Sequence, residues 1–245
     1  MSLKSLPRLL CGLLLCGALE AAQAAAPVIP LYHATYSAGR GSLSVGTARF
    51  SLTHNGDGSY TYRSVTKPTG LMALFFDDVV TETSRFTLAG DHLQSLHYSY
   101  QHRSDDRDKL EQIRFDWTKG LAYSSEGASH QTMPLTAGTG DRLLAQLAMS
   151  LDALQGKPEN DYSVLDHDKV QTYRFMRTGN ASVNTPAGKY DTVEITRHDD
   201  SKNRVTTFWL APKLDYLPVQ MRQTEPGKAT ISLVLTDIKF DTAKK

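Results

Sequence analysis

The sequence contains little cysteine, and none of it lies where a folded domain would use it. Both cysteines, Cys11 and Cys16, fall within an N-terminal segment that we interpret as a cleaved leader. The remaining chain has no thiol, which excludes a disulfide scaffold, a cysteine enzyme and a thiolate metal site. A secreted domain without disulfides depends on its own hydrophobic core, and this chain is long enough to form one.

An excess of charge of one sign is also missing. The full chain has 27 Lys and Arg against 26 Asp and Glu, and loss of Lys4, Arg8 and Glu20 with the leader leaves the two signs balanced. A nucleic-acid-binding protein needs a basic surface for phosphate contacts, so nucleic acid is excluded as a partner. Charge alone would not recruit the chain to anionic lipid either.

Motifs that would declare a reaction are missing as well. The sequence has no His-Glu-x-x-His pair, no Gly-x-Ser-x-Gly elbow and no glycine-rich phosphate loop. Ser64 and Lys67 match Ser-x-x-Lys, but they lie in a predicted strand, where the two side chains point to opposite faces. Asp166-His167-Asp168 and His198-Asp199-Asp200 are interpreted as solvated surface turns. We therefore predict no enzyme activity, no catalytic residue, no metal ligand and no cofactor.

The first 24 residues have the pattern of a secretory signal peptide. Lys4 and Arg8 form a basic start, Leu9–Leu19 is a short apolar run, and Ala22-Gln23-Ala24 is a small-x-small cleavage site. The apolar run is shorter than the roughly 20 residues that span a membrane. The large leucines before Cys16 disfavour lipidation there. The pattern predicts export to the periplasm and a single domain over residues 25–245.

That domain has the pattern of antiparallel β-structure. Alternating stretches such as Thr47–His54 and Ser59–Thr66 flank Asn55-Gly56-Asp57-Gly58, whose residues suit a tight hairpin turn. Leucines at helical spacing predict one amphipathic helix over residues 141–154, which Asp141 caps. A phase change in the last strand predicts a bulge near Thr236-Asp237. About ten strands and one helix predict a mainly β fold, a strongly curved antiparallel sheet forming an open or half-closed barrel. Charged strand positions and the polar end Asp241–Lys245 argue against an integral membrane protein.

Several segments, taken in order, carry a family resemblance. They are Val45–Phe50, Lys67–Phe75, Val79–Glu82, Asp141–Ala148, Thr207–Pro212 and Tyr216–Val219. Together they resemble the exported bacterial proteins grouped as domain of unknown function 3108, over nearly all of the chain after the leader. That resemblance implies no established activity. Trp209-Leu210 followed by Leu217-Pro218-Val219 is also similar to an element of the periplasmic lipoprotein carriers, which implies a half-barrel that holds acyl chains or peptides.

One segment does not fit a simple sheet. Gly70–Phe76 is an unbroken apolar run between two predicted strands, whereas connectors normally lie on the surface and are polar. The run either plugs one end of the sheet or binds something apolar, and the sequence leaves both open. The candidate ligand-binding residues are Leu71, Met72, Leu74, Phe75, Phe76 and Trp209.

These observations favour a non-enzymatic periplasmic protein that binds or shields an apolar, lipid-like envelope ligand. A deep apolar cavity would support that interpretation. The alternative is an interaction module for a cell-envelope protein or polysaccharide, and a filled core with an exposed apolar patch would support it. An unrecognised hydrolase is a third possibility, and it requires a cleft that brings a histidine, a carboxylate and a hydroxyl together.

Overall fold

The computed structural model describes residues 29–90 and 92–241, so the predicted signal peptide lies outside the described residues. The strands are β1 (Tyr32–Arg40), β2 (Leu43–His54), β3 (Tyr60–Pro68), β4 (Val79–Ala89), β5 (His92–Ser104), β6 (Arg107–Asp116), β7 (Leu121–Glu126), β8 (Ser129–Pro134), β9 (Asn160–Asp166), β10 (Lys169–Thr185), β11 (Gly188–Asp199), β12 (Arg204–Ala211), β13 (Leu217–Thr224) and β14 (Ile231–Phe240). The helices are α1 (Arg142–Leu154) and the short 3-10 turns η1 (Gly70–Leu74), η2 (Asp200–Lys202) and η3 (Pro212–Leu214). None of the helices in the described residues has the length and apolarity needed to cross a membrane.

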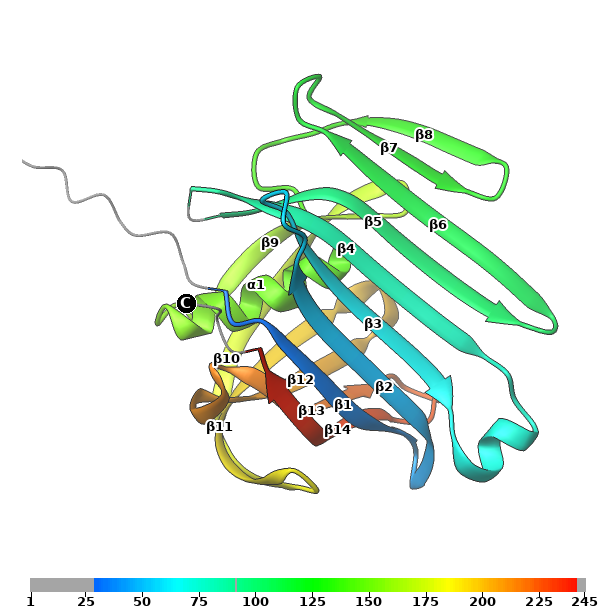
Figure 1. The fold of residues 1–245 in the computed structure, drawn as a ribbon, viewed down its shortest axis with the longest axis vertical. Coiled ribbons are helices and arrows are strands. Elements are labelled where there is room, and N and C mark those ends of the chain that lie inside the picture. Colours follow the sequence, from blue (N-terminus) through cyan, green and yellow to red (C-terminus); the bar gives the residue numbers. More distant parts are fainter. Residues whose placement is uncertain (1–28, 91, 242–245) are drawn as a thin grey trace, which may run out of the picture.

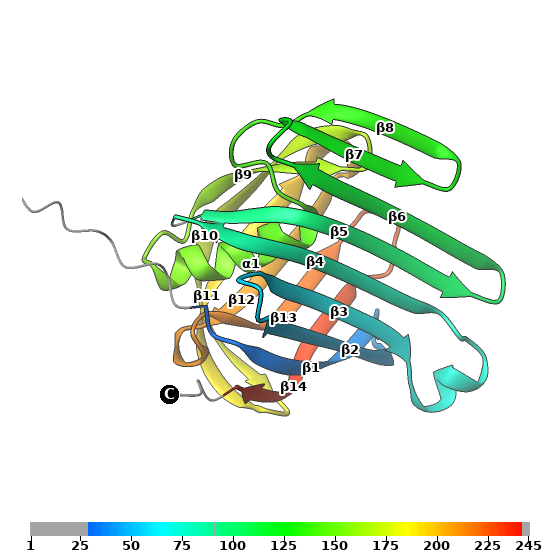
Figure 2. The ribbon, with the colours of Figure 1, turned by 45° about the horizontal axis from the view of Figure 1, so that its top comes forward.

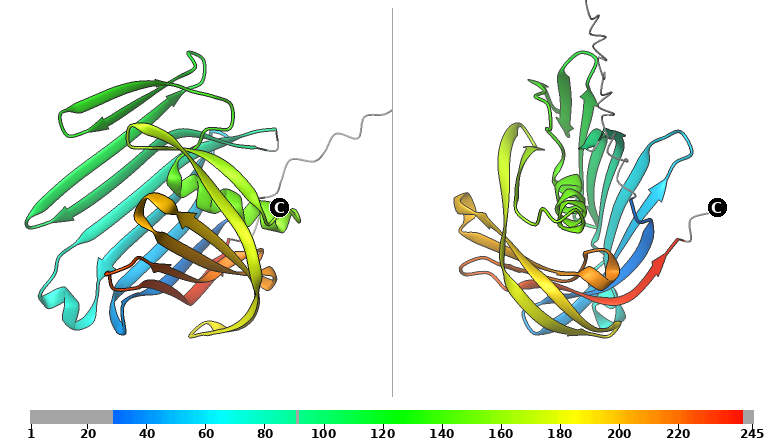
Figure 3. Two further views of the ribbon diagram at one scale, coloured as in Figure 1. Left: turned by 180° about the vertical axis from the view of Figure 1, so that it is seen from behind. Right: turned by 90° about the vertical axis from the view of Figure 1, so that its left-hand side faces the viewer.

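The fourteen strands of the described residues form one antiparallel sheet. Chain neighbours are also sheet neighbours, except that β8 and β9 lie at opposite edges and β1 pairs with β14 in the middle. The edges are β8 and β9, and within the described residues no strand ladder joins them. The sheet curls around α1, which lies inside the curve (Figures 1 and 3). Turning the molecule shows β1–β6 extending well beyond the helix at one end (Figure 2). The predicted fold, a curved antiparallel sheet with one helix, is confirmed.

The sequence-based strand assignment was incomplete at one edge. We did not predict β7 and β8, and β8 is an edge strand with most of its residues exposed, so it carries no hydrophobic alternation. The sequence pattern also indicates two strands, Val170–Thr178 and Ala181–Thr185, but they are one strand, β10, with a register shift between Arg177 and Gly179. The predicted bulge is confirmed, because Thr35 pairs with Asp237 while Tyr36 pairs with Leu235. Thr236 is the extra residue, and its hydroxyl donates to the carbonyl of Thr35.

Helix α1 is buried on two sides because it fills the concave face of the sheet. The leucines of one stripe, Leu143, Leu144, Leu147 and Leu151, pack in a large cluster with Tyr62 and Phe86 from the first half of the sheet and Trp209 and Leu217 from the second. The opposite stripe consists of smaller or more flexible side chains, Ala145, Met149 and Ala153, which pack against β9–β12. The helix therefore joins the two halves of the sheet in one core.

Asp141 fixes the start of the helix and also attaches it to the sheet. It is buried, and one carboxylate oxygen accepts bonds from the backbone N–H groups of Leu143 and Leu144. The other oxygen accepts from the hydroxyls of Ser84 on β4 (2.6 Å) and Ser95 on β5 (2.8 Å). Burial raises the pKa of the Asp141 carboxyl to about 6, against the lowering effect of these hydrogen bonds.

Truncating Leu147 tests how much the burial of α1 contributes to the free energy of unfolding. Leu147 is 3% exposed, so Leu147→Ala should lower the free energy of unfolding by about 2–5 kcal/mol. Leu154→Ala is the matched control, because Leu154 is 39% exposed at the end of the same helix and should cost far less. Urea denaturation of both variants measures the difference. Equal losses would show that the burial of α1 does not determine stability.

The buried carboxyl predicts a pH dependence of stability. The pKa of Asp141 is about 6 in the folded chain against an ordinary 3.8, so the folded state binds more protons between these values. Stability from this group is therefore greatest below pH 4 and falls as the pH rises through about 6. Relative to Asp141→Asn, which carries no titrating group, the wild type should lose about 2–3 kcal/mol between pH 4 and 7. Parallel denaturation curves for the two proteins that do not diverge with pH would contradict the assignment.

Candidate functional site

The apolar segment found in the sequence forms a short 3-10 turn that projects from the end of the sheet farthest from α1. It is the cyan turn at the lower right of Figure 1, between β3 and β4. Gly70 begins the turn with a φ of +61°, a value that favours glycine. Leu71, Leu74, Phe75 and Phe76 are between 55 and 74% exposed. The segment is therefore not a plug buried in the end of the sheet, one of the two interpretations that the sequence left open.

An open groove lies beside this turn. Its volume is about 420 Å³. Met72 and Phe76 line one side, and residues of the concave face, among them Ala38, Thr66 and Val80, form the floor. The turn thus presents Met72 and Phe76 to the groove, and the exposed Leu71, Leu74 and Phe75 extend the apolar surface beside it.

The charges around the groove are unevenly placed. Arg40 and Lys67 line it, both are exposed, and neither forms an ion pair within the described residues. The acidic lining residue, Asp78, is already engaged by the His102 ring at 2.7 Å. On the other side of the turn, Asp77 raises the pKa of Asp105 by repulsion between the two carboxylates. The positive potential is therefore concentrated at Arg40 and Lys67.

The structure does not bring Trp209 to this groove. Trp209 lies on β12, and β2, β1, β14 and β13 separate that strand from β3. Its side chain is 8% exposed, its indole N–H donates to Glu194 at 3.1 Å, and the Arg222 guanidinium lies 5.1 Å from its ring centre. These contacts are those of a structural residue. The lining residues Ala38, Arg40, Lys67 and Val80 were missed, because their one signal was their place on alternating strands.

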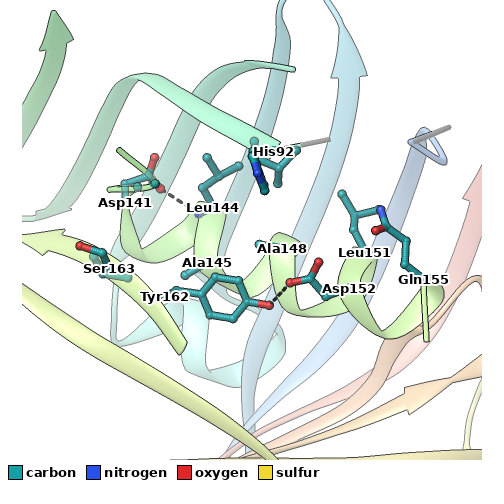
Figure 4. A pocket seen from close by; sticks show the side chains of 14 residues that line it. His92, Asp141, Leu144, Ala145, Ala148, Leu151, Asp152, Gln155, Tyr162 and Ser163 are labelled. Atoms are coloured by element: carbon teal, nitrogen blue, oxygen red, sulfur yellow. Dashed lines mark hydrogen bonds between the residues drawn. The ribbon is translucent and has the colours of Figure 1, made fainter. Parts of the chain in front are cut away.

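A second, smaller pocket lies between α1, the start of β5 and β9 (Figure 4). Leu144, Ala148 and Leu151 of the helix form its apolar side, and Tyr162 donates to Asp152 at its rim. Its volume is about 130 Å³. Ligand pockets usually have about 300–1,000 Å³, so this space suits ordered water better than a ligand. The open groove at the far end is the better candidate.

Comparisons with known proteins support the fold and identify no activity. The family model described as "Protein of unknown function (DUF3108)" matches residues 31–234. The search of curated proteins found no match. A crystal structure of a β-barrel-like protein of domain of unknown function DUF1849 from Brucella abortus is similar, with a TM-score of 0.54 and 12% identity. The match covers 88% of this chain and 99% of that chain, and at this identity it shows a shared fold alone.

Exposure of the turn predicts that its outward side chains contribute little to folding. Leu74 and Phe75 are each 74% exposed, so the double variant Leu74→Ser with Phe75→Ser should change the free energy of unfolding by less than about 1 kcal/mol. Thermal unfolding checks this. A loss of several kcal/mol would mean that the turn folds back into the core in solution.

Proposed function

We propose that this chain, which belongs to the DUF3108 family of proteins of unknown function, binds an apolar envelope molecule in the periplasm without catalysing a reaction. The binding site is the groove at the open end of the sheet, together with the turn from Leu71 to Phe76. The ligand is an amphiphile with an acyl chain and an anionic head group. The observation that carries the proposal is an apolar turn exposed to solvent directly beside an apolar groove.

Apolar side chains exposed to water are unfavourable in free energy, and a ligand that covers them would recover that free energy. Burying a large aliphatic or aromatic side chain is worth about 1.5–3 kcal/mol, and the turn leaves four such side chains exposed. Because they are exposed, these side chains contribute little to folding, and their burial would favour binding instead. The groove volume of about 420 Å³ lies in the range of small-molecule sites.

The head group follows from the charges. Arg40 and Lys67 stand at the groove, whereas Asp77 and Asp105 make the far side of the turn acidic. An anionic carboxylate or phosphate is attracted to the first side and repelled from the second. The ligand chain then lies along Met72 and Phe76 with its head near Arg40, which follows the buried Ala38 on the same face of β1.

A second candidate function is an interface for another envelope protein. Leu43, the first residue of β2, is 64% exposed, and because β2 contacts η1 it adds to the apolar surface of Leu71, Leu74 and Phe75. The space around α1 is mostly filled, with a pocket of about 130 Å³ beside the helix, and the groove is open to solvent. An exposed apolar patch over a filled core is typical of a protein interaction site.

A fluorescent fatty acid distinguishes the two functions. The wild type should bind a dansyl fatty acid saturably at micromolar concentration, and the variant Met72→Asp with Phe76→Asp should lose at least tenfold in affinity because two carboxylates enter the groove. Val170→Asp is the matched control, since Val170 is 49% exposed on β10 in the other half of the sheet, and it should bind normally.

The head group is tested with Arg40→Glu. This variant should weaken binding of the fatty acid but leave binding of the corresponding uncharged alcohol unchanged. Failure of the wild type to bind either probe would refute the lipid site and leave the protein interface as the function that the turn supports.

A further inference from the structure

The two halves of the sheet approach each other at a polar cluster that the proposed ligand site does not use. The first half contributes Glu111 on β6 and Glu126 on β7, which are direct partners across those strands. The second half contributes His167, from the tight turn between β9 and β10, with a φ of +57°. Since the chain runs through α1 between these elements, their contact closes the open side of the curve with side chains.

The three side chains converge on one point. The Nδ1 atom of His167 lies 3.2 Å from an oxygen of Glu111 and 3.2 Å from an oxygen of Glu126. One ligand atom from each of the three residues lies within 4.8 Å of the others. A neutral imidazole can donate from Nδ1 to one carboxylate at most.

Glu111 gives the cluster its unusual character. Its side chain is 1% exposed, and neither of its carboxylate oxygens accepts a hydrogen bond within the described residues. A buried carboxylate without hydrogen bonds is costly, and a second carboxylate directly across the strand pair adds repulsion. An additional positive group at this point would remove both costs.

The fixed cations nearby do not balance the acids. Arg142 contacts three carboxylates, those of Glu82 (2.9 Å), Asp166 (3.0 Å) and, more distantly, Glu111 (3.5 Å). Lys109 contacts Glu126 at 2.8 Å. Four carboxylates therefore share two permanent cations, which leaves an excess of two negative charges. A divalent cation supplies that amount.

We propose that Glu111, Glu126 and His167 bind a divalent transition-metal ion that ties β6 and β7 to the turn between β9 and β10. In a tetrahedral zinc site with bonds of about 2.0–2.1 Å, neighbouring ligand atoms are about 3.3 Å apart, close to the observed nitrogen–oxygen separations. Imidazole and carboxylate ligands suit Zn²⁺. The fourth position faces a cleft of about 420 Å³ lined by Ser124, Gln131 and Asp168, among others, so water completes the site.

A bound ion would hold β6 and β7 against the turn between β9 and β10. Among the described residues no strand ladder joins β8 to β9, so the halves of the sheet are held at this side by α1 and by side chains. An ion that binds the folded chain alone raises its stability in proportion to its affinity and concentration. Metal binding and resistance to unfolding are therefore linked.

Zn²⁺ itself is the probe for this proposal. The full exported chain, first stripped with a chelator, should bind one Zn²⁺ with a dissociation constant of about 10 μM or below in titration calorimetry, and its melting temperature should rise. His167→Ala and Glu126→Gln should each weaken binding at least tenfold. His198→Ala is the matched control, because His198 is exposed in the similar sequence His198-Asp199-Asp200 and should leave binding unchanged.

Two further measurements separate a metal site from a structural cluster. Glu111→Gln should raise the stability of the stripped protein and remove its response to Zn²⁺, because the buried charge is gone while the shape is kept. Co²⁺ in the site should show the strong visible absorption of tetrahedral coordination. No binding of Zn²⁺ at 100 μM, or binding that His167→Ala does not weaken, would overturn the proposal.

Discussion

The structure depends on the burial of α1 from two sides. A sheet of this curvature has a concave face too wide for its own side chains to fill, and the helix occupies the space. Its leucine stripe packs in a cluster that draws residues from both halves of the sheet, and the smaller stripe of Ala145, Met149 and Ala153 packs against β9–β12. The halves are hydrogen-bonded through β1 and β14, and on the side where the β8 and β9 edges remain apart the helix packs between them.

Two adjacent residues at the start of the helix face different surroundings. Asp141 points into the core, where the hydroxyls of Ser84 and Ser95 and two backbone N–H groups satisfy its carboxylate. Arg142 points to the open side, where it joins Glu82 on β4 to Asp166 on β9. Asp141 holds the start of the helix against β4 and β5, and Arg142 joins the two halves of the sheet across the open side. The remaining negative charge around Arg142 is what suggests a cation at Glu111.

Much of the fold was predictable because its signals are local. Turn residues such as Asn55 and Gly56 mark hairpins, leucine spacing marks the helix, and a phase change marks the bulge at Thr236. The edge strand β8 lacked such a signal, since neither face of it is fully buried. The leucine spacing places Leu154 on the buried stripe of the helix, but Leu154 is the last residue of α1 and is 39% exposed.

The sites were less predictable, because they depend on contacts between distant strands. The apolar run at Leu71–Phe76 is visible in the sequence, but only the structure shows that it stands in solvent beside a groove. Trp209 was grouped with it on residue type alone. His167 was interpreted as part of a solvated turn, and its contact with Glu111 and Glu126 depends on the closing of the whole curve. Sequence spacing contains no information on that approach.

The helix packs into one end of the concave face, and we propose that an apolar ligand binds in the groove at the other end. Methyl NMR of the labelled protein during titration with a fatty acid distinguishes the two ends. Binding in the groove should give saturable shifts at the methyl groups of Ala38, Met72 and Val80, with Leu147 and Met149 unchanged. Shifts confined to Leu147 and Met149, or no shift at any of these methyl groups, would contradict it.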